Sequence, residues 1–156
     1  MVGENDRQYL FSYLEDRFGI PEGLFRDYLL FKGRGKWFII KAGDNMTHAS
    51  QLKISKSGLR AFHKVGGFIK PTTRLIQKFG SYATRARVEI KSAQLECLLG
   101  GESIPLDSDL DKGYVILTLG NDQILGLGLL INGRIRSQLP KKEIRKAMLG
   151  PGAPLK

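Results

Sequence analysis

The segment between residues 113 and 137 has the pattern of hydrophobic and polar positions that antiparallel strands produce. An apolar run rich in β-branched and aromatic residues, Tyr114–Leu119, is followed by a second apolar run, Ile124–Ile131. Asn132-Gly133 then predicts a type I′ hairpin turn, because that turn requires a positive φ at both central residues. The chain returns as Arg134-Ile135-Arg136, so that one face packs and the other presents two guanidinium groups. The pattern predicts three antiparallel strands, the closing half of a small barrel with one basic rim.

Two glycines, Gly126 and Gly128, interrupt the second of these strands. A G-x-G pattern indicates nucleotide binding only where a strand, a glycine-rich turn and a helix follow one another, and here a hairpin follows instead. Glycine inside a strand more often marks a bend or a close approach of two backbones. We therefore expect no nucleotide cofactor at these glycines, although RNA could still approach the bare backbone there.

The N-terminal half predicts short helices followed by hairpins. Apolar residues repeat with helical spacing up to Phe18, and Pro21 is placed to begin a second short helix. Glycine-containing turns at residues 32–35 and 65–67 then predict two hairpins. Both helices carry an acidic balance, which argues that they are packing elements and do not contact RNA.

Trp37 and Phe38 are adjacent in the strand predicted after the first of these turns, and therefore point to opposite faces of the sheet. One ring is expected in the core, and the sequence leaves open which one. An exposed ring beside Lys36 would suit base stacking, whereas the commoner fate of tryptophan is an anchored core position.

The densest positive charge falls on a predicted helix and on the strand after it. Arg74 and Lys78 lie one turn apart on the outer face of the helix, with no acidic residue between them. Like charges at this spacing repel, so a helix that carries them is expected to meet an anion. The strand that follows, Thr84–Ile90, is predicted to present Arg85 and Arg87 on one face.

These elements predict an α+β protein of two small lobes. Residues 1–82 are expected to form a mixed α+β lobe, residues 83–150 a small β-barrel domain, and residues 151–156 a flexible tail. An acidic loop at residues 102–112 precedes the barrel strands. A chain of 156 residues is long enough to bury a sizeable core in this arrangement.

Charge alternates in blocks along the chain, whose net charge is +10. Residues 1–31 carry a net −3 and residues 92–131 a net −5, whereas residues 32–91 carry +12 and residues 132–156 carry +6. Such blocks predict a basic face on a folded body, and an excess of this size suits a polyanionic partner. We expect nucleic acid as that partner, in preference to a generally solvated basic surface.

The sequence argues against several other classes of protein. No apolar run approaches the roughly 20 residues of a membrane span, and the polar, acidic start is unlike a signal peptide. A single cysteine, Cys97, excludes an internal disulfide and favours the cytoplasm. His48 and His63 have no acidic or cysteine neighbours that would suggest a metal site. Paired catalytic carboxylates, Ser-His or Cys-His pairs and phosphate-binding loops are not apparent, so we expect neither an enzyme nor a cofactor.

Several short segments occur in a characteristic order. In the first half they are FGIPEGLF, KWFII, KISKSGL and FIKPTTRLIQKFG, and in the second LLGGESIPLD, GYVIL, LGLGLL and INGRIRSQLPK. Their order and spacing, over roughly residues 18–146, resemble the C-terminal region of Fmu/Sun-family RNA 5-methylcytosine methyltransferases. The resemblance implies that the barrel is PUA-like. The methyltransferase domain, with its paired catalytic cysteines and S-adenosylmethionine loop, is missing, which implies a free-standing RNA-binding module.

These observations predict a non-catalytic protein that binds structured RNA, tRNA or rRNA, as an accessory to RNA modification or ribosome biogenesis. An RNA methyltransferase is a candidate partner, and neither membrane binding nor a preference for DNA is expected. The alternative is a protein-interaction subunit that docks a separate RNA-modifying enzyme, which a contiguous apolar surface patch would indicate.

The predicted RNA-binding residues flank the barrel in sequence. First and last strands are often neighbours in a compact antiparallel barrel, so the two clusters could merge into one groove. Because arginine suits phosphate and can stack on a base, replacing Arg85 or Arg134 by Ala is expected to weaken RNA binding with little change in melting temperature. The predicted residues are Arg74, Lys78, Arg85, Arg87, Arg134, Arg136, Lys141 and Lys142.

Overall fold

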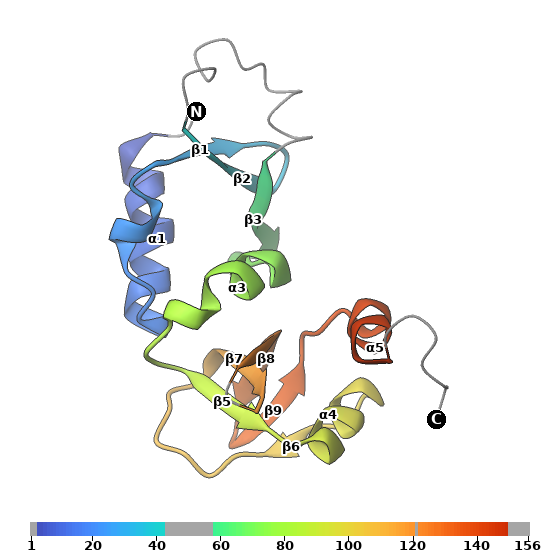
Figure 1. Cartoon of the computed structure of the whole chain (residues 1–156). Helices are drawn as coiled ribbons and strands as arrows, with labels where there is room; N and C mark the ends of the chain where they lie inside the picture. Colours follow the sequence, from blue (N-terminus) through green and yellow to red (C-terminus); the bar gives the residue numbers. More distant parts are fainter. Residues whose placement is uncertain (1–2, 43–57, 121, 150–156) are drawn as a thin grey trace. The chain divides into compact units, whose positions relative to one another are not determined.

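The computed structural model describes residues 3–42, 58–120 and 122–149. The chain divides into two compact units, Met1–Arg85 (unit 1) and Ala86–Lys156 (unit 2), and each is described by itself (Figure 1). His48 and the predicted tail at residues 151–156 lie outside the described residues.

Within the described residues, unit 1 combines helices with a four-stranded antiparallel sheet, sheet A. The helices are α1 (Glu4–Phe18), η1 (Glu22–Phe25), α3 (Thr73–Phe79) and η3 (Gly80–Tyr82), and the strands are β1 (Tyr28–Lys32), β2 (Lys36–Lys41), β3 (Leu59–Val65) and β4 (Phe68–Pro71). Strands that follow one another in the chain are neighbours in the sheet, in the order β1-β2-β3-β4. Both predicted hairpins are therefore confirmed.

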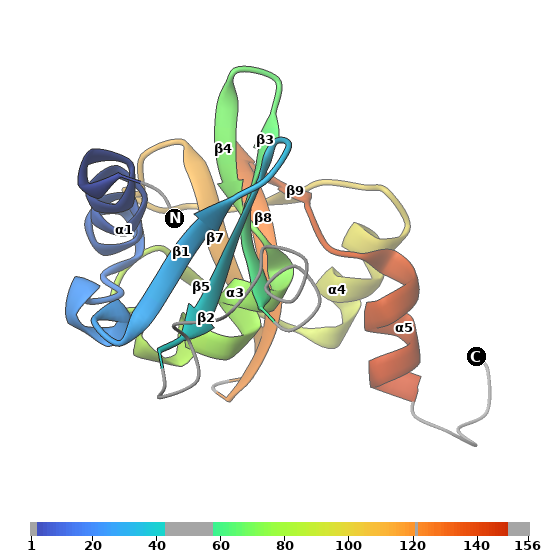
Figure 2. The same cartoon turned by 90° about the horizontal axis from the view of Figure 1, so that it is seen from above.

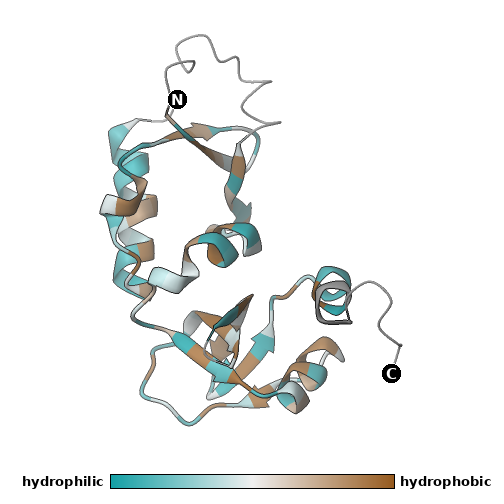
Figure 3. Cartoon of the chain, viewed as in Figure 1, coloured by the Kyte–Doolittle hydropathy of each residue, from teal (hydrophilic) through white to brown (hydrophobic). Residues whose placement is uncertain are grey.

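Aromatic side chains fill the space between the helices and sheet A. Phe11 of α1 stacks on Phe25 with ring centroids 4.4 Å apart, and it lies 6.3 Å from the ring of Phe62 in β3. Phe79 of α3 contacts Phe25 at 4.8 Å. Figure 3 shows hydrophilic and hydrophobic bands alternating along α1, which buries the apolar residues of one side. α1 and α3 thus share one aromatic core with one face of the sheet.

The two faces of sheet A differ in burial. Trp37 lies opposite Phe62 on the face that packs against the helices, and its side chain is 5% exposed. Phe38 points to the other face and is partly exposed, so tryptophan is the core residue of this adjacent pair. In Figure 2, β1 to β3 lie in front of α3, so the face of the sheet that is turned toward the viewer is the one away from that helix. The face that carries Phe38 is called the outer face of sheet A below.

Within the described residues, unit 2 is built on a five-stranded sheet, sheet B. Its strands are β5 (Arg87–Ile90), β6 (Ile104–Pro105), β7 (Gly113–Leu119), β8 (Gln123–Ile131) and β9 (Arg134–Ser137), and its helices are α4 (Ser92–Leu99) and α5 (Lys141–Leu149). The strand order is β5-β7-β8-β9-β6, with β5 parallel to β7 and the other pairs antiparallel. Helices and two sheets together confirm the α+β class.

Two expectations about the barrel are wrong. Its first strand, β5, is separated from β9 by β7 and β8, so the first and last strands are not neighbours. The acidic segment 102–112 is not only a loop, because it contains β6, which pairs with β9 along Ile104 and Ile135. A strand of two residues has no periodicity that a sequence pattern could reveal.

The glycines of β8 serve close packing. A Cβ atom added to Gly128 would lie 2.6 Å from Cγ2 of Ile135 and 3.1 Å from Cδ1 of Leu117, which confirms a close approach between strands. Gly126 has a φ of 149° and lies where the pairing of β7 with β8 shifts by one residue. Both glycines are buried, so the idea that RNA approaches their backbone is wrong. None of the described helices is long and apolar enough to cross a membrane.

Candidate nucleic-acid interface

β9 presents two arginines on one side of sheet B. The turn before it has φ values of 52° at Asn132 and 73° at Gly133, as a type I′ turn requires. This turn sets the strand register, and Arg134 and Arg136 are exposed while Ile135 between them is fully buried. The predicted turn and the predicted alternation of basic and apolar residues are both confirmed.

Arg134 is held by a neighbouring segment. Its Nε donates a hydrogen bond to Oγ of Ser103 at 2.7 Å, and its Nη2 donates to the carbonyl oxygen of Ser103 at 2.9 Å. Ser103 directly precedes the edge strand β6, which pairs with β9. The guanidinium therefore fastens this edge of the sheet, in addition to any contact with RNA.

Arg136 and Arg87 lie on the same face of sheet B. Arg136 is opposite Leu129, which is opposite Tyr114, and Arg87 is opposite Ile116 on the neighbouring strand. Because alternate residues of β7 share a face, Tyr114 and Ile116 put both arginines on one side. β5 and β9 are three strand spacings apart, which corresponds to about 14 Å.

The centre of that face is buried. Ile116 and Leu127, which pair with each other between the two arginines, are 0% and 1% exposed. Burial also raises the pKa of the Tyr114 hydroxyl above its usual value. Arg87 and Arg136 are therefore exposed at separate margins of the face, and apolar residues occupy the space between them.

The basic start of α5 lies beside the end of α4. Arg145 donates from Nη2 to the carbonyl oxygen of Leu99, the last residue of α4, at 3.4 Å. Nζ of Lys141 lies 4.0 Å from the position of a Cβ atom built on Gly101. A cation at a helix C-terminus complements the helix dipole. Arg145 was not among the predicted site residues, and its contact with Leu99 fixes α5 against α4. Lys141 and Lys142, on the first turn of α5, are exposed.

In unit 1 the basic residues of α3 are on its exposed side, as predicted. Arg74 and Lys78 are exposed, one turn apart. Nζ of Lys78 lies 5.8 Å from the ring centre of Tyr28 and 5.7 Å from that of Phe79, within the range of a cation–π contact. These contacts reduce the freedom of Lys78 and keep its charge at the surface.

Arg85 does not lie in a strand, and this part of the prediction is wrong. β5 begins only at Arg87, because Ala86 takes a left-handed conformation with φ of 52°. The backbone N–H of Arg85 donates to the carbonyl oxygen of Phe18 at 2.9 Å, and its Nη1 donates to that of Asp16 at 3.3 Å. Arg85 thus interacts with the last turn of α1, where a cation is favourable.

The eight predicted residues are divided between the two units. Arg74, Lys78 and Arg85 belong to unit 1, and the other five belong to unit 2. Within unit 2, the β9 arginines lie across the sheet from Arg87. A single groove that joins the clusters of both units stays a prediction.

The outer face of sheet A is basic and aromatic, which was not foreseen. Cross-strand pairing aligns Phe31, Phe38 and Arg60 in one row and Lys36, His63 and Lys70 in the next. A compositional signal could have found it, because β1 to β4 contain six Lys or Arg residues and no Asp or Glu. The face consists of Leu29, Phe31, Lys36, Phe38, Ile40, Arg60, His63, Val65, Phe68 and Lys70.

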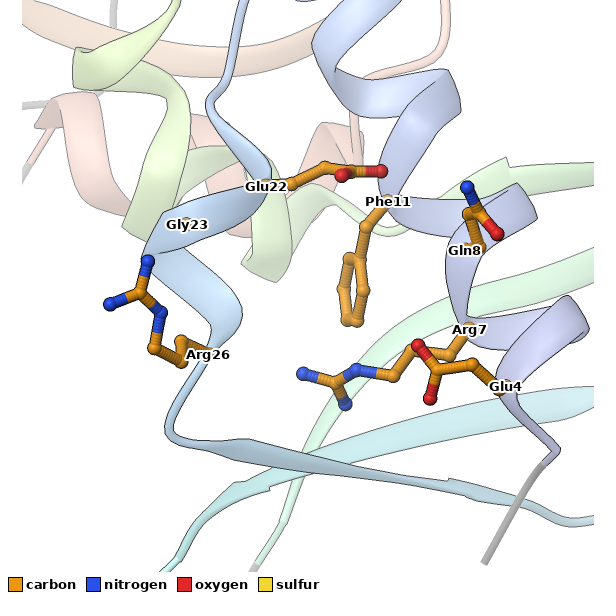
Figure 4. Close-up of a pocket in the computed structure, with 7 residues that line it drawn as sticks. All are labelled: Glu4, Arg7, Gln8, Phe11, Glu22, Gly23 and Arg26. Atoms are coloured by element: carbon orange, nitrogen blue, oxygen red, sulfur yellow. The ribbon is translucent and has the colours of Figure 1, made fainter.

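A pocket in unit 1 has a structural explanation. Figure 4 shows the Arg7 side chain beside the Phe11 ring, and its guanidinium carbon lies 4.9 Å from the ring centre. Arg7 also donates to the carbonyl oxygens of Tyr28 at 2.8 Å and Phe25 at 2.5 Å. It therefore ties α1 to η1 and β1. Acidic residues line the pocket as well, so it does not favour an anion.

Metal ligation has no support from the part of the chain that the structure describes. Within it, no group of three or more His, Cys, Asp or Glu residues is placed to hold a metal ion. Cys97 is a half-buried free thiol in α4. Exposed Lys and Arg side chains in both units can bind anions, and exposed aromatic rings in unit 1 can stack on planar groups.

Residues 85–145 match the family model described as the Methyltransferase RsmF PUA domain. No curated protein matches the chain. A PUA domain binds RNA and is not a catalytic domain, so the match indicates RNA binding at the level of the family. It also confirms the predicted combination of an α+β fold with a PUA-like barrel. Residues 85–145 are thus similar to the PUA domain of the methyltransferase RsmF, which confirms the resemblance to the PUA-like domain of Fmu/Sun-family methyltransferases.

Proposed function

We propose that the chain binds structured RNA, tRNA or rRNA, and assists RNA modification or ribosome biogenesis without catalysing a reaction itself. The match of residues 85–145 to an RNA-binding domain carries this proposal. The net charge of +10 supports a polyanionic partner. A cytoplasmic location is part of the proposal, because a lone cysteine fits a reducing compartment.

Arg136 is the residue of unit 2 best placed to contact a phosphate. It is exposed and extends from a regular strand, whereas the guanidinium of Arg134 is engaged by Ser103. Lys142, on the first turn of α5, supplies a second exposed cation. Their contacts position an RNA on the unit, and backbone contacts of this kind carry little sequence information.

The alternative function, a subunit that docks a separate RNA-modifying enzyme, would favour a contiguous apolar patch. The large hydrophobic side chains found exposed within the described residues are Tyr9, Val65, Phe68 and Tyr82, all in unit 1. Unit 2 exposes acidic side chains as well as cations, so the preference for RNA there rests on the match to an RNA-binding domain. An RNA methyltransferase as a further partner stays part of the proposal.

A binding titration tests the proposal. Fluorescence anisotropy with a labelled tRNA and with an rRNA hairpin should give affinities that fall by about 10³ between about 50 and 200 mM salt if six or more phosphates are contacted. Arg136→Gln should weaken binding several-fold and lower the salt slope by about one. Lys112→Gln, which removes an exposed cation of the same unit outside the predicted set, is the matched control.

Two results would overturn the proposal. One is an affinity for RNA that does not respond to salt. The other is that Arg136→Gln and Lys142→Gln both bind RNA as tightly as the control variant Lys112→Gln. Catalysis is tested separately by calorimetry with S-adenosylmethionine. Saturable binding of that cofactor, or methyl transfer to RNA by the purified chain, would contradict the absence of catalysis.

A further inference from the structure

Basic side chains lie on the outer face of sheet A, and its four strands contain no Asp or Glu. Lys36, His63 and Lys70 lie directly opposite one another on β2, β3 and β4. Burial, and then the charges of Lys70 and Arg60, lower the pKa of His63, which places these groups within electrostatic reach of one another. Burial also lowers the pKa of Lys70. An arrangement that disfavours further positive charge is relieved by a bound anion.

Aromatic rings lie next to these cations. Phe31 is opposite Phe38, and Phe38 is opposite Arg60, so two rings and a guanidinium form a row across three strands. Phe68 is opposite Val65 at the end of the β3–β4 hairpin, and its side chain is 76% exposed. Exposing so large an apolar ring to water is unfavourable unless a partner covers it.

The core does not need these rings. On the inner face, Leu30, Ile39 and Phe62 are at most 1% exposed and already pack against the helices. On the outer face, Phe31 and Phe38 are partly exposed and Phe68 is largely exposed, so each ring has a surface that a bound group could contact. Their combination with lysine also argues against a protein partner, because lysine is depleted at the centres of protein interfaces.

We propose that the outer face of sheet A binds a single-stranded stretch of nucleic acid. Unpaired bases stack on Phe31, Phe38 and Phe68, and the phosphates pair with Lys36 and Arg60. Four-stranded sheets with exposed aromatic residues bind two or three bases in this way. Four strands at a spacing of about 4.8 Å span about 14 Å, which fits that number of nucleotides. A base pair offers no free face for such stacking, so duplex RNA is not bound here.

This site goes beyond the proposed function, because it lies in unit 1 and residues 85–145 do not include it. The experiment uses the full chain and a fluorescein-labelled oligouridine of about ten nucleotides, a length typical of single-strand binding sites. Phe68→Ala should raise the dissociation constant about fivefold or more, because one stacked base is lost. Phe68→Leu should show a similar loss, and Phe68→Trp should retain or tighten binding.

The charged residues have their own variants. Arg60→Gln with Lys36→Gln should weaken oligouridine binding and lower its salt slope by about 0.7 per lost contact. Arg26→Gln, which removes an exposed cation of the same unit away from the outer face, is the matched control and should bind as the unchanged protein does. Melting temperatures of the Phe68 variants should stay unchanged, since that side chain is exposed.

Three outcomes would overturn the inference. The first is unchanged oligouridine binding by Phe68→Ala. The second is full binding by Phe68→Leu, which would indicate an apolar contact without stacking. The third is an equal loss of affinity in Arg26→Gln and in the double variant of Arg60 and Lys36. The inference and the proposed function fail separately. If Arg136→Gln leaves tRNA binding unchanged while Phe68→Ala weakens oligouridine binding, only the proposed function fails, and the reverse pattern removes only the inference.

Discussion

Replacing Arg134 by Ala tests whether this arginine fastens the edge of sheet B. The substitution removes both hydrogen bonds to Ser103, one to its Oγ and one to its carbonyl oxygen. The backbone pairing of β6 with β9 then has to hold a two-residue strand in place without them. We therefore expect a loss of stability, in contrast to the expectation from sequence that the melting temperature would change little.

The magnitude follows from the two bonds. A hydrogen bond contributes about 0.5–1.5 kcal/mol net, and these two are exposed to solvent, so we use the lower end for each. The free energy of unfolding should fall by about 1 kcal/mol. For a domain the size of unit 2 this corresponds to a shift in melting temperature of about 4–8 °C.

Amide hydrogen exchange gives a local readout of the same effect. The N–H of Leu106 donates to the carbonyl oxygen of Gly133 at 2.8 Å, so its exchange reports detachment of the β6 segment. A loss of about 1 kcal/mol corresponds to roughly fivefold faster exchange. Arg136→Ala, on the same strand and face, is the control and should leave this exchange rate unchanged.

The refuting result is equal exchange at Leu106 in Arg134→Ala and in the unchanged protein. A further check is Ser103→Ala, which removes only the bond to Oγ and should have a smaller effect. If the effects of Arg134→Ala and Ser103→Ala add fully in the double variant, the two side chains are not coupled and the contact does not fasten the edge.

Three further predictions concern packing, helix capping and pH. Gly128→Ala should cost about 1–3 kcal/mol, because the new Cβ would lie 2.6 Å from Cγ2 of the buried Ile135, and urea denaturation measures the loss. Thr72→Ala should lower the free energy of unfolding by about 1–2 kcal/mol, because Oγ1 of Thr72 accepts a hydrogen bond from the N–H of Leu75 at the start of α3. Thr72→Ser should retain most of the stability, and an unchanged denaturation midpoint in Thr72→Ala would contradict the cap. His63 has a lowered pKa in the folded chain, so the unfolded chain takes up the proton first and stability should fall as pH falls below about 6.5. His63→Gln should remove this part of the pH dependence, and an identical pH profile in both proteins would refute it.

Local chemistry made part of unit 2 predictable from sequence. The turn at Asn132-Gly133 and the alternation around Ile135 are encoded in residues that are adjacent in the chain. Partner choice between distant strands is not encoded in this way. The parallel pairing of β5 with β7 and the position of β6 at the far edge depend on the packing of the whole sheet, and no local pattern reports them.

Arg85 shows why site residues were harder to predict than strands. Its assignment to a strand face assumed a continuous strand from Thr84, and the left-handed conformation of Ala86 breaks that continuity. Non-glycine residues rarely adopt this conformation, and an alanine gives no sign of it. Arg134 was correctly placed on an exposed face, but the acceptor that engages it lies 31 residues away in the chain.

The outer face of sheet A has a signal in the sequence that single strands do not reveal. Within one strand, the sequence indicates only that one of Trp37 and Phe38, next to Lys36, faces away from the core. Pairing Phe31 with Phe38 and Lys36 with His63 requires the register of three strands, which the hairpin turns alone do not fix. The absence of acidic residues from all four strands was the stronger sign.

The two sheets also differ in how early each can form during synthesis. Sheet A joins strands that follow one another in the chain, whereas the edge strand β6 has to wait for β9, and its contact from Ser103 to Arg134 spans 31 residues. At translation rates of about 5–20 residues per second, that wait is about 2–6 seconds. Near the end of this wait β8, one of the most apolar strands of the chain, is synthesised, and its edge on the side where β9 will lie is unpaired until β9 follows. Nascent unit 2 is thus most open to mispairing just before its final basic strand leaves the ribosome, and pulse-labelled amides of β3 and β4 should become protected before that of Leu106.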